Sequence, residues 1–289
     1  EATSPMTMLH YLTPTGMSDL EYCETGRLFY INKLMPNHGK TTAPTVIGKF
    51  EHTVIEQFYK LTKIDWKELD SFENDKNLDN RISLAVQDSI EISRENFPLF
   101  FDCLEENIDP IKYRLKYLNE LKSQQIKKLL KKGMSYNSAV AITLPFAIEK
   151  WLSSKVYGIR GIADLLFHNA DGTITIEDIK SHNDRFDAFI HRSAHVAQGN
   201  AYAILVEEVY GKPVKQFQIF YSMDCHTETF KITKQSKQNV RDSILAGQIL
   251  LQGDLPPKLE GLQKLKCKNC YKRDNCFSLD NPDSQGVSS

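Results

Sequence analysis

Two aspartates and a lysine are spaced so that they could bind a divalent cation and act on a phosphate. Asp164 precedes, and Asp178 and Lys180 follow, an Asp-Gly turn at 171–172 that lies between two apolar runs. This pattern predicts an antiparallel hairpin, so the aspartates lie on paired strands. Side chains alternate along a strand, and Asp178 and Lys180 therefore share a face. Carboxylates are hard ligands for Mg²⁺ or Mn²⁺, while the lysine could orient or deprotonate a water or stabilise phosphate charge.

The same three residues would also fit a solvated strand edge with a surface ion pair, which contributes little to stability. The order of the neighbouring motifs favours a functional site instead. Gly161 stands three residues before Asp164, and Gln198 and Tyr202 lie four residues apart in the helical run that follows the hairpin. Residues four apart share a face of a helix, so Gln198 and Tyr202 project together.

Gly-x-x-Asp, Asp-x-Lys and Gln-x-x-x-Tyr in this order resemble the RecB-like branch of the PD-(D/E)XK nucleases. His52, four residues after Gly48, is similar to that family's first motif, although a helical histidine is more often a surface or hydrogen-bonded residue. The resemblance implies a catalytic set, a set of metal ligands that includes one backbone carbonyl, and a DNA-binding set. These are Asp164, Asp178, Lys180, Gln198 and Tyr202 for catalysis; His52, Asp164, Asp178 and the carbonyl of Ile179 for the metal; and Arg160, Gln198 and Tyr202 for DNA.

Three cysteines near the end of the chain, Cys267, Cys270 and Cys276, could converge on one metal centre. Three thiolates do not complete a tetrahedral set, so a fourth ligand is needed. The candidates are Cys23, Cys103 and Cys225. Six cysteines in a chain with no visible secretory signal argue against a disulfide framework.

A remote amino-terminal cysteine followed by Cys-x2-Cys-x5-Cys resembles the iron–sulfur members of the RecB-like family. These are the AddB-type nucleases, the CRISPR-associated RecB-like exonucleases and exonuclease V. The resemblance implies that Cys23 joins Cys267, Cys270 and Cys276 around a 4Fe–4S cluster that ties the two ends of the chain together. Four thiolates suit Zn²⁺ as well, and the resemblance favours the cluster.

Composition predicts a soluble globular protein. The chain has 289 residues, of which 41% are hydrophobic and 25% charged. No apolar run approaches the ~20 residues that a membrane span needs, and we expect a cytoplasmic protein with no membrane partner. A net charge of −1 argues against a uniformly basic binder. Residues 65–109 carry 13 acidic and 4 basic side chains, whereas residues 111–133 carry 8 basic and 1 acidic. The second segment is either a solvated helix face or a local surface for a DNA backbone.

Strands that alternate with a long helix predict an α/β fold, and the resemblance implies a restriction-endonuclease-like core. In this core a mixed sheet is flanked by helices, with a helical insertion and a cysteine-ligated metal-cluster staple. The expected regions are a flexible N-terminus at 1–16, helices bearing Cys23 and His52 at 17–64, the insertion at 65–138, the nuclease core at 139–252, the cysteine region at 253–277 and a disordered tail at 278–289.

Individual elements can also be predicted. Ser18 is expected to cap a short helix, and an apolar stripe predicts a second helix at about 48–63. Strands are expected at 145–153, 157–167, 173–179, 214–221 and 227–232, and helices at about 184–209 and 234–251. Apolar residues at helical spacing in 111–129 leave the lysines and Arg114 pointing outward. His191 and His195 are expected to line the cleft, and the missing glutamate of a His-Glu-x-x-His motif makes a zinc site the minor interpretation.

Together the motifs predict a metal-dependent DNA exonuclease that hydrolyses phosphodiester bonds, mainly in single-stranded DNA. The resemblance places it in CRISPR adaptation or DNA repair, with a CRISPR integrase or repair proteins as partners. The alternative is an iron–sulfur DNA-binding or scaffold protein with a vestigial nuclease site.

Overall fold

A five-stranded mixed sheet forms the centre of the computed structural model, which describes residues 11–34, 42–68, 77–181, 185–270 and 272–279. The strands lie in sequence order across the sheet, and all neighbours are antiparallel except β3 and β4, which are parallel. The long helix α8 (Arg185–Tyr210) makes the crossover that a parallel pair requires. The strands are β1 (Ala147–Ser154), β2 (Ile159–His168), β3 (Ile174–Lys180), β4 (Val214–Tyr221) and β5 (His226–Lys231).

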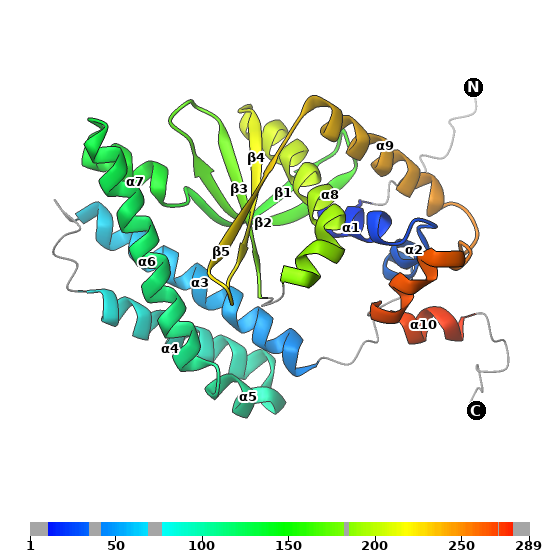
Figure 1. The fold of residues 1–289 in the computed structure, drawn as a ribbon, viewed down its shortest axis with the longest axis horizontal. Helices are drawn as coiled ribbons and strands as arrows, with labels where there is room; N and C mark the ends of the chain where they lie inside the picture. The colour runs from blue at the N-terminus through cyan, green and yellow to red at the C-terminus, as the bar shows by residue number, and fades with distance from the viewer. Residues whose placement is uncertain (1–10, 35–41, 69–76, 182–184, 271, 280–289) are drawn as a thin grey trace, which may run out of the picture.

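Helices cover both faces of the sheet and create two separate cores (Figure 1). On one face α8 packs together with α1 (Pro14–Tyr22) and α9 (Lys234–Leu250). The opposite face is covered by α3 (Ala43–Glu68) and by the helices that follow it. Those helices are α4 (Leu78–Asn96), the short η2 (Pro98–Phe100), α5 (Phe101–Glu105), α6 (Ile108–Lys131) and α7 (Tyr136–Thr143).

The side chains of β3 divide between the two cores as the alternation predicts. Ile174 and Ile176 belong to the core under α8, whereas Ile179 belongs to the core under α3. Asp178 and Lys180 share the parity of Ile176 and therefore face α8. This confirms the expectation that the two residues project from one face of the hairpin.

The alternation of side chains along β1 and β2 is interrupted at the same cross-strand position, that of Glu149 and Asp164. Their ladder pairs the residues on either side of Glu149 and Asp164 but not these two with each other. Glu149 has a positive φ of 49°, which is rare for a residue with a side chain. Beyond this point the alternation shifts phase, because Ala163 and Leu166 both contribute to the core under α8 although they lie three residues apart. The kink at the rung Glu149–Asp164 therefore turns two carboxylates out of the regular pleat.

Several expected boundaries are corrected at the amino-terminal end. Thr13, rather than Ser18, caps α1, since its Oγ1 accepts a hydrogen bond from the Gly16 backbone at 3.0 Å. Ser18 lies inside that helix. The expected flexible segment at 1–16 extends too far, because Leu12 is already fully buried and forms a β-bridge to Ile159. The second expected helix starts at Ala43, five residues earlier than predicted, and ends at Glu68.

Most of the remaining elements match their predicted positions within two residues, and β4 has the expected bounds. The described part of 65–138 is helical, as expected. Arg114 is a correction: it points inward from α6 rather than outward, with 13% of its side chain exposed. Its Nε lies 3.1 Å from Oε1 of Glu51, a carboxylate that is 2% exposed. A buried charge needs a partner, and this ion pair overrides the simple polar-outward pattern of the helix.

Described helices from the amino-terminal and carboxyl-terminal regions meet. Helix α2 (Arg27–Leu34) lies beside η3 (Gly261–Asn269) and α10 (Arg273–Ser278), as the blue and orange-red ribbons in Figure 1 show. The Tyr22 hydroxyl donates a hydrogen bond to the carbonyl of Lys266 at 2.8 Å. None of the helices in the described ranges combines the length and the apolar character needed to cross a membrane.

Candidate active site and cysteine pocket

Asp164 joins the hairpin to the helix that carries His52. Its Oδ2 lies 2.9 Å from Nε2 of His52 and accepts a hydrogen bond from the Ile179 backbone at 2.8 Å. The ladder between β2 and β3 ends at the pair Leu165–Glu177, so the Asp164 carboxylate takes the backbone N–H that would otherwise need another acceptor. This double engagement fixes the carboxylate where the two strands separate.

A close helix–strand approach brings His52 to this point. Gly48 lies one turn before His52, and a Cβ atom at Gly48 would come within 2.5 Å of the Ser181 hydroxyl. Ser181 directly follows the last residue of β3. A side chain at position 48 would have to displace the Ser181 hydroxyl. The Gly-x-x-x-His motif therefore has a steric reason as well as a chemical one.

His52, Glu149 and Asp164 form a three-ligand group. Each offers one ligand atom, and these atoms all lie within 4.8 Å of one another. Carboxylate oxygens suit Mg²⁺ and Mn²⁺, and imidazole is a further ligand for transition metals. The positive φ of Glu149 costs of the order of 1–3 kcal/mol, a strain that is characteristic of functional positions.

The electrostatics of the group fit a divalent cation. Burial lowers the pKa of His52, but hydrogen bonds and attraction to Asp164 and Glu56 outweigh this and raise it to about 11. Burial, aided by the proximity of Glu56 and Asp164, raises the pKa of Glu149 to about 7. Both shifts report an excess of negative charge around His52. A bound cation would balance that charge in place of protons.

Asp178, Lys180 and Gln198 form a second, adjacent cluster. The Lys180 ammonium lies 2.7 Å from Oδ2 of Asp178 and donates to Oε1 of Gln198 at 3.3 Å. The Gln198 amide donates to Oδ1 of Asp178 at 3.2 Å. Burial raises the pKa of Asp178 to about 6 despite the lysine. Burial lowers the pKa of Lys180, but pairing with Asp178 raises it above the usual value overall, so the lysine stays protonated.

Tyr202 ties α8 to β2. Its hydroxyl donates a hydrogen bond of 2.6 Å to the carbonyl of Ile162, and burial raises the pKa of the phenol. The phenol is thus a neutral group one helical turn from Gln198, as the spacing predicts. Arg160 lies on the same strand, with its guanidinium over the rings of Tyr11 and Trp151.

The structure brings together six of the predicted residues and adds two carboxylates. His52 and Asp164 meet in the three-ligand group, Asp178, Lys180 and Gln198 meet beside it, and Tyr202 flanks both. The sequence interpretation missed Glu149 and Glu56. Glu56 has a signal, since it lies four residues after His52 on the same helical face, and the two side chains are paired. Glu149 has none, because its role depends on the kink.

The role expected for the two other histidines stays a prediction. His195 is buried, with 8% exposure, as are Asp178 and Gln198. The side chain of His191 lies outside the described residues.

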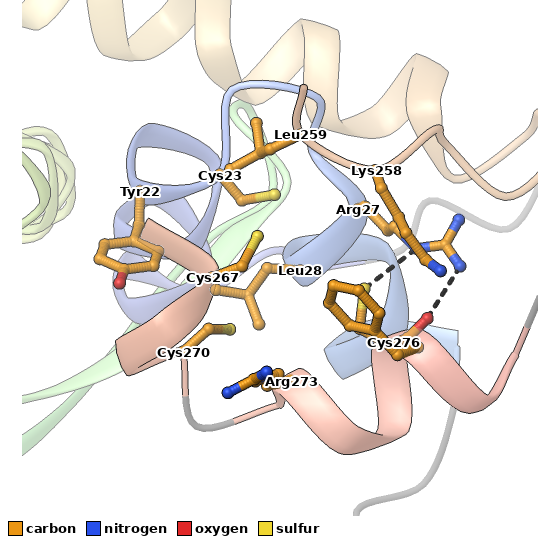
Figure 2. A pocket seen from close by; sticks show the side chains of 11 residues that line it. Tyr22, Cys23, Arg27, Leu28, Lys258, Leu259, Cys267, Cys270, Arg273 and Cys276 are labelled. Atoms are coloured by element: carbon orange, nitrogen blue, oxygen red, sulfur yellow. Dashed lines mark hydrogen bonds between the residues drawn. The ribbon is translucent and has the colours of Figure 1, made fainter. Parts of the chain in front are cut away.

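Four cysteines from the two ends of the chain line one cavity. These are Cys23, at the end of α1, and Cys267, Cys270 and Cys276 near the carboxyl end. Figure 2 shows the sulfur atoms of Cys23, Cys267 and Cys270 directed into the same space, with Cys276 on its far side. Burial and the neighbouring sulfurs, including that of Cys23, raise the pKa of Cys270. Cys23, rather than Cys103 or Cys225, is thus the cysteine that lines the cavity with the carboxyl-terminal three.

The surroundings of the cavity fit a thiolate-bound metal centre. Arg27 is buried and donates from Nε to Sγ of Cys276 at 3.2 Å and from Nη2 to its carbonyl at 3.1 Å (Figure 2). Lys258 and Arg273 also line the cavity. Positive groups and N–H donors offset the charge of thiolates and of the sulfurs of a cluster.

Comparison with known proteins gives a family. The crystal structure of a "Putative exonuclease" from Eubacterium rectale is similar to this chain, with 12% sequence identity and a TM-score of 0.46. The match covers 92% of this chain and 98% of that one. No curated protein matches the sequence. The sequence model of the PD-(D/E)XK nuclease superfamily matches residues 11–276, a span that includes the hairpin, His52 and all four pocket cysteines. The chain belongs to the PD-(D/E)XK nuclease superfamily.

Proposed function

We propose that this protein is a metal-dependent deoxyribonuclease that hydrolyses phosphodiester bonds and acts as an exonuclease, mainly on single-stranded DNA. One observation supports this most directly. A histidine and two carboxylates converge within 4.8 Å, and the ion pair of Lys180 and Asp178 lies on the neighbouring strand. Superfamily membership agrees with the nuclease chemistry. The preference for single strands and for ends rests on the resemblance to RecB-like enzymes.

His52, Glu149 and Asp164 would hold Mg²⁺ or Mn²⁺, and Asp178 and the Ile179 carbonyl are further candidates. When bound, the cation would supply electrophilic activation of the scissile phosphate. Glu149 is an addition to the set that the sequence predicts. Asp178 is engaged by Lys180 and Gln198, so its role as a ligand depends on rearrangement of this cluster.

Lys180 acts through its charge in this proposal. Since pairing with Asp178 keeps the ammonium protonated, Lys180 orients the attacking water and stabilises negative charge on the phosphate rather than removing a proton. Gln198 holds both members of the pair in place by accepting from Lys180 and donating to Asp178. Tyr202 keeps β2 at a fixed distance from α8 through its hydrogen bond to the Ile162 carbonyl.

The cysteine pocket is proposed to hold a 4Fe–4S cluster through Cys23, Cys267, Cys270 and Cys276, with Zn²⁺ as the less favoured occupant. The cluster would supply a cross-link between the two ends of the chain. Arg27 supports this role, because it contacts the Cys276 sulfur and also donates to the Pro256 carbonyl at 2.6 Å.

A role in CRISPR adaptation or in DNA repair, with an integrase or repair proteins as partners, rests on the same resemblance. The alternative is an iron–sulfur DNA-binding or scaffold protein whose nuclease site is vestigial. A scaffold would need neither the His52–Asp164 contact nor the Lys180–Asp178 pair, and this chain retains both.

The test is cleavage of end-labelled single-stranded DNA with Mg²⁺ or Mn²⁺. The wild type is compared with Lys180→Ala and with Lys234→Ala, a matched loss of charge at the exposed first residue of α9. We expect cleavage by the wild type and Lys234→Ala but not by Lys180→Ala. A circular single strand should resist cleavage if the enzyme needs an end. Binding of DNA without cleavage by any of the proteins would favour the scaffold.

A further inference from the structure

An exposed apolar pair lies on the hairpin just beyond the kink. Trp151 on β1 and Ile162 on β2 are paired across the ladder. Their side chains are 55% and 41% exposed, respectively. Indole rings bury large areas when they find a partner, so an exposed tryptophan beside an exposed isoleucine marks a contact surface.

Arg160 packs against two aromatic rings of this surface. Its guanidinium carbon lies 5.4 Å from the centroid of the Tyr11 ring and 5.9 Å from that of the Trp151 ring. Among the described residues no carboxylate pairs with Arg160, so its positive charge is available to an anion. Lys33 holds the segment that carries Tyr11, since its ammonium donates a hydrogen bond to the carbonyl of Tyr11 at 2.5 Å. The charge of Arg160 also contributes to lowering the pKa of Lys33.

The surface adjoins the proposed active site. Trp151 follows Glu149 by two residues, and Ile162 precedes Asp164 by two. Two residues of a strand span roughly 7 Å. That is about the length of two stacked nucleotides at roughly 3.4 Å each. A strand whose phosphate lay at the three-ligand group would therefore place a neighbouring base beside the indole of Trp151.

We propose that Tyr11, Trp151, Arg160 and Ile162 form a stacking platform for unpaired bases of the DNA strand that enters the active site. This inference rests on the proposed function and names the strand-binding subsite of the same reaction. Aromatic faces and arginine bind single strands through stacking, cation–π attraction and phosphate contact. A duplex hides the faces of its bases, so the platform selects single strands or frayed ends.

The uncompensated charge of Arg160 argues for nucleic acid rather than for a protein partner. Arg160 is exposed, and its guanidinium lies over the Trp151 ring. A polyanion with flat bases matches both the charge and the ring. An apolar protein partner would match the ring and leave the charge buried without a counterion.

The first test is equilibrium binding of a fluorescent 12-nucleotide oligo-dT, measured by anisotropy with Ca²⁺ in place of the catalytic metal. We expect Trp151→Ala to weaken binding about tenfold, as loss of one stacked base predicts. Leu99→Ala is the control, because Leu99 is a large apolar residue of η2 with 93% exposure. Binding of a blunt hairpin duplex should change less than twofold in both variants. Unchanged oligo-dT binding by Trp151→Ala would overturn the proposal.

The second test is intrinsic fluorescence, because the chain has two tryptophans. Trp66 is fully buried, so quenching by oligo-dT reports Trp151. We expect quenching in the wild type and its loss in Trp151→Phe, a variant that keeps an aromatic ring and most of the affinity. Quenching that persists in Trp151→Phe would place the DNA elsewhere.

These results separate the two proposals. A wild type that shows quenching but no cleavage would refute the catalytic function and leave the platform intact. A wild type that cleaves DNA while Trp151→Ala binds it normally would refute the platform and leave the function intact.

Discussion

The candidate active site and the cysteine pocket are both suited to metals, but they are held in different ways. In the active site the ligand residues already bind one another: Asp164 pairs with His52, and the Ile179 backbone holds Asp164. The cysteine pocket lies between two chain ends, and Arg27 donates to the sulfur of Cys276.

This difference separates what each centre does for the protein. Protons and internal hydrogen bonds can stand in for a cation at the active site, so the sheet can form without it. Four thiolates around one cavity repel one another when ionised, and a metal centre that joins them contributes its binding free energy to folding. We therefore expect damage to the pocket to affect stability and damage to the active site to affect rate.

Cys270→Ala should have the largest effect. Loss of one ligand from the cluster that links the chain ends should destabilise the protein by of the order of 5 kcal/mol, a part of the free energy of such centres. For a chain of this size the melting temperature would fall by roughly 10–20 °C. Thermal melts of Cys270→Ala and of Cys103→Ala, which lies on α5 away from the pocket, provide the comparison. Equal stability of Cys270→Ala and wild type would show that the pocket does not act as a staple.

Asp164→Asn should leave the fold intact and abolish most of the activity. Asparagine has the same shape and still offers an oxygen to the Ile179 backbone, but it loses the charge that a cation requires. We expect cleavage of single-stranded DNA to slow by roughly 10³-fold, about 4 kcal/mol, in a single-turnover assay. A melting temperature close to that of the wild type is the control. A large loss of stability in Asp164→Asn with little loss of cleavage rate would contradict the assignment of rate to the active site and stability to the pocket.

Gly48→Ala should be intermediate, because it disturbs the placement of His52 rather than a ligand. Alanine normally stabilises a helix relative to glycine, but here its Cβ would meet the Ser181 hydroxyl at 2.5 Å. Because the Ser181 hydroxyl can rotate away, we expect a cost of only about 1 kcal/mol, together with slower cleavage. Adding Ser181→Ala removes the obstructing oxygen and should restore both quantities. Failure of the double variant to recover would locate the damage elsewhere.

The pH dependence of stability tests the contacts of His52 with the carboxylates alone. The folded pKa of His52, about 11, lies above its unfolded value of 6.5. Its contribution to stability is therefore fully present below pH 6.5 and is lost as the pH rises toward 11. Without added Mg²⁺ or Mn²⁺, the melting temperature of the wild type should fall between pH 7 and 9 more steeply than that of His52→Gln. Parallel curves would show that His52 is not held by the carboxylates.

Sequence patterns could predict much of this molecule because local chemistry determines those parts. The hairpin follows from the apolar runs and the Asp-Gly turn, and the shared face of Asp178 and Lys180 follows from the strand period. The bounds of β4 follow from a short run rich in aromatic and branched residues. In each case neighbours along the chain supply the information.

Other features depend on contacts that no local pattern records. Glu149 reaches the site because β1 and β2 turn over together, and a residue with positive φ has no sequence signature here. Arg114 faces inward because a buried carboxylate from another helix lies opposite. Thr13 replaces Ser18 as the cap because the chain segment before α1 is fixed against Ile159.

The ion pair of Glu51 with Arg114 has a mechanical consequence. Glu51 directly precedes His52 on α3, and Arg114 belongs to α6. To slide α6 along α3 would separate two buried charges, at a cost of about 3–5 kcal/mol if neither found a new partner. The ion pair therefore favours one register of α6 against the part of α3 that carries His52, and a substitution on the inner face of α6 would be felt at the site.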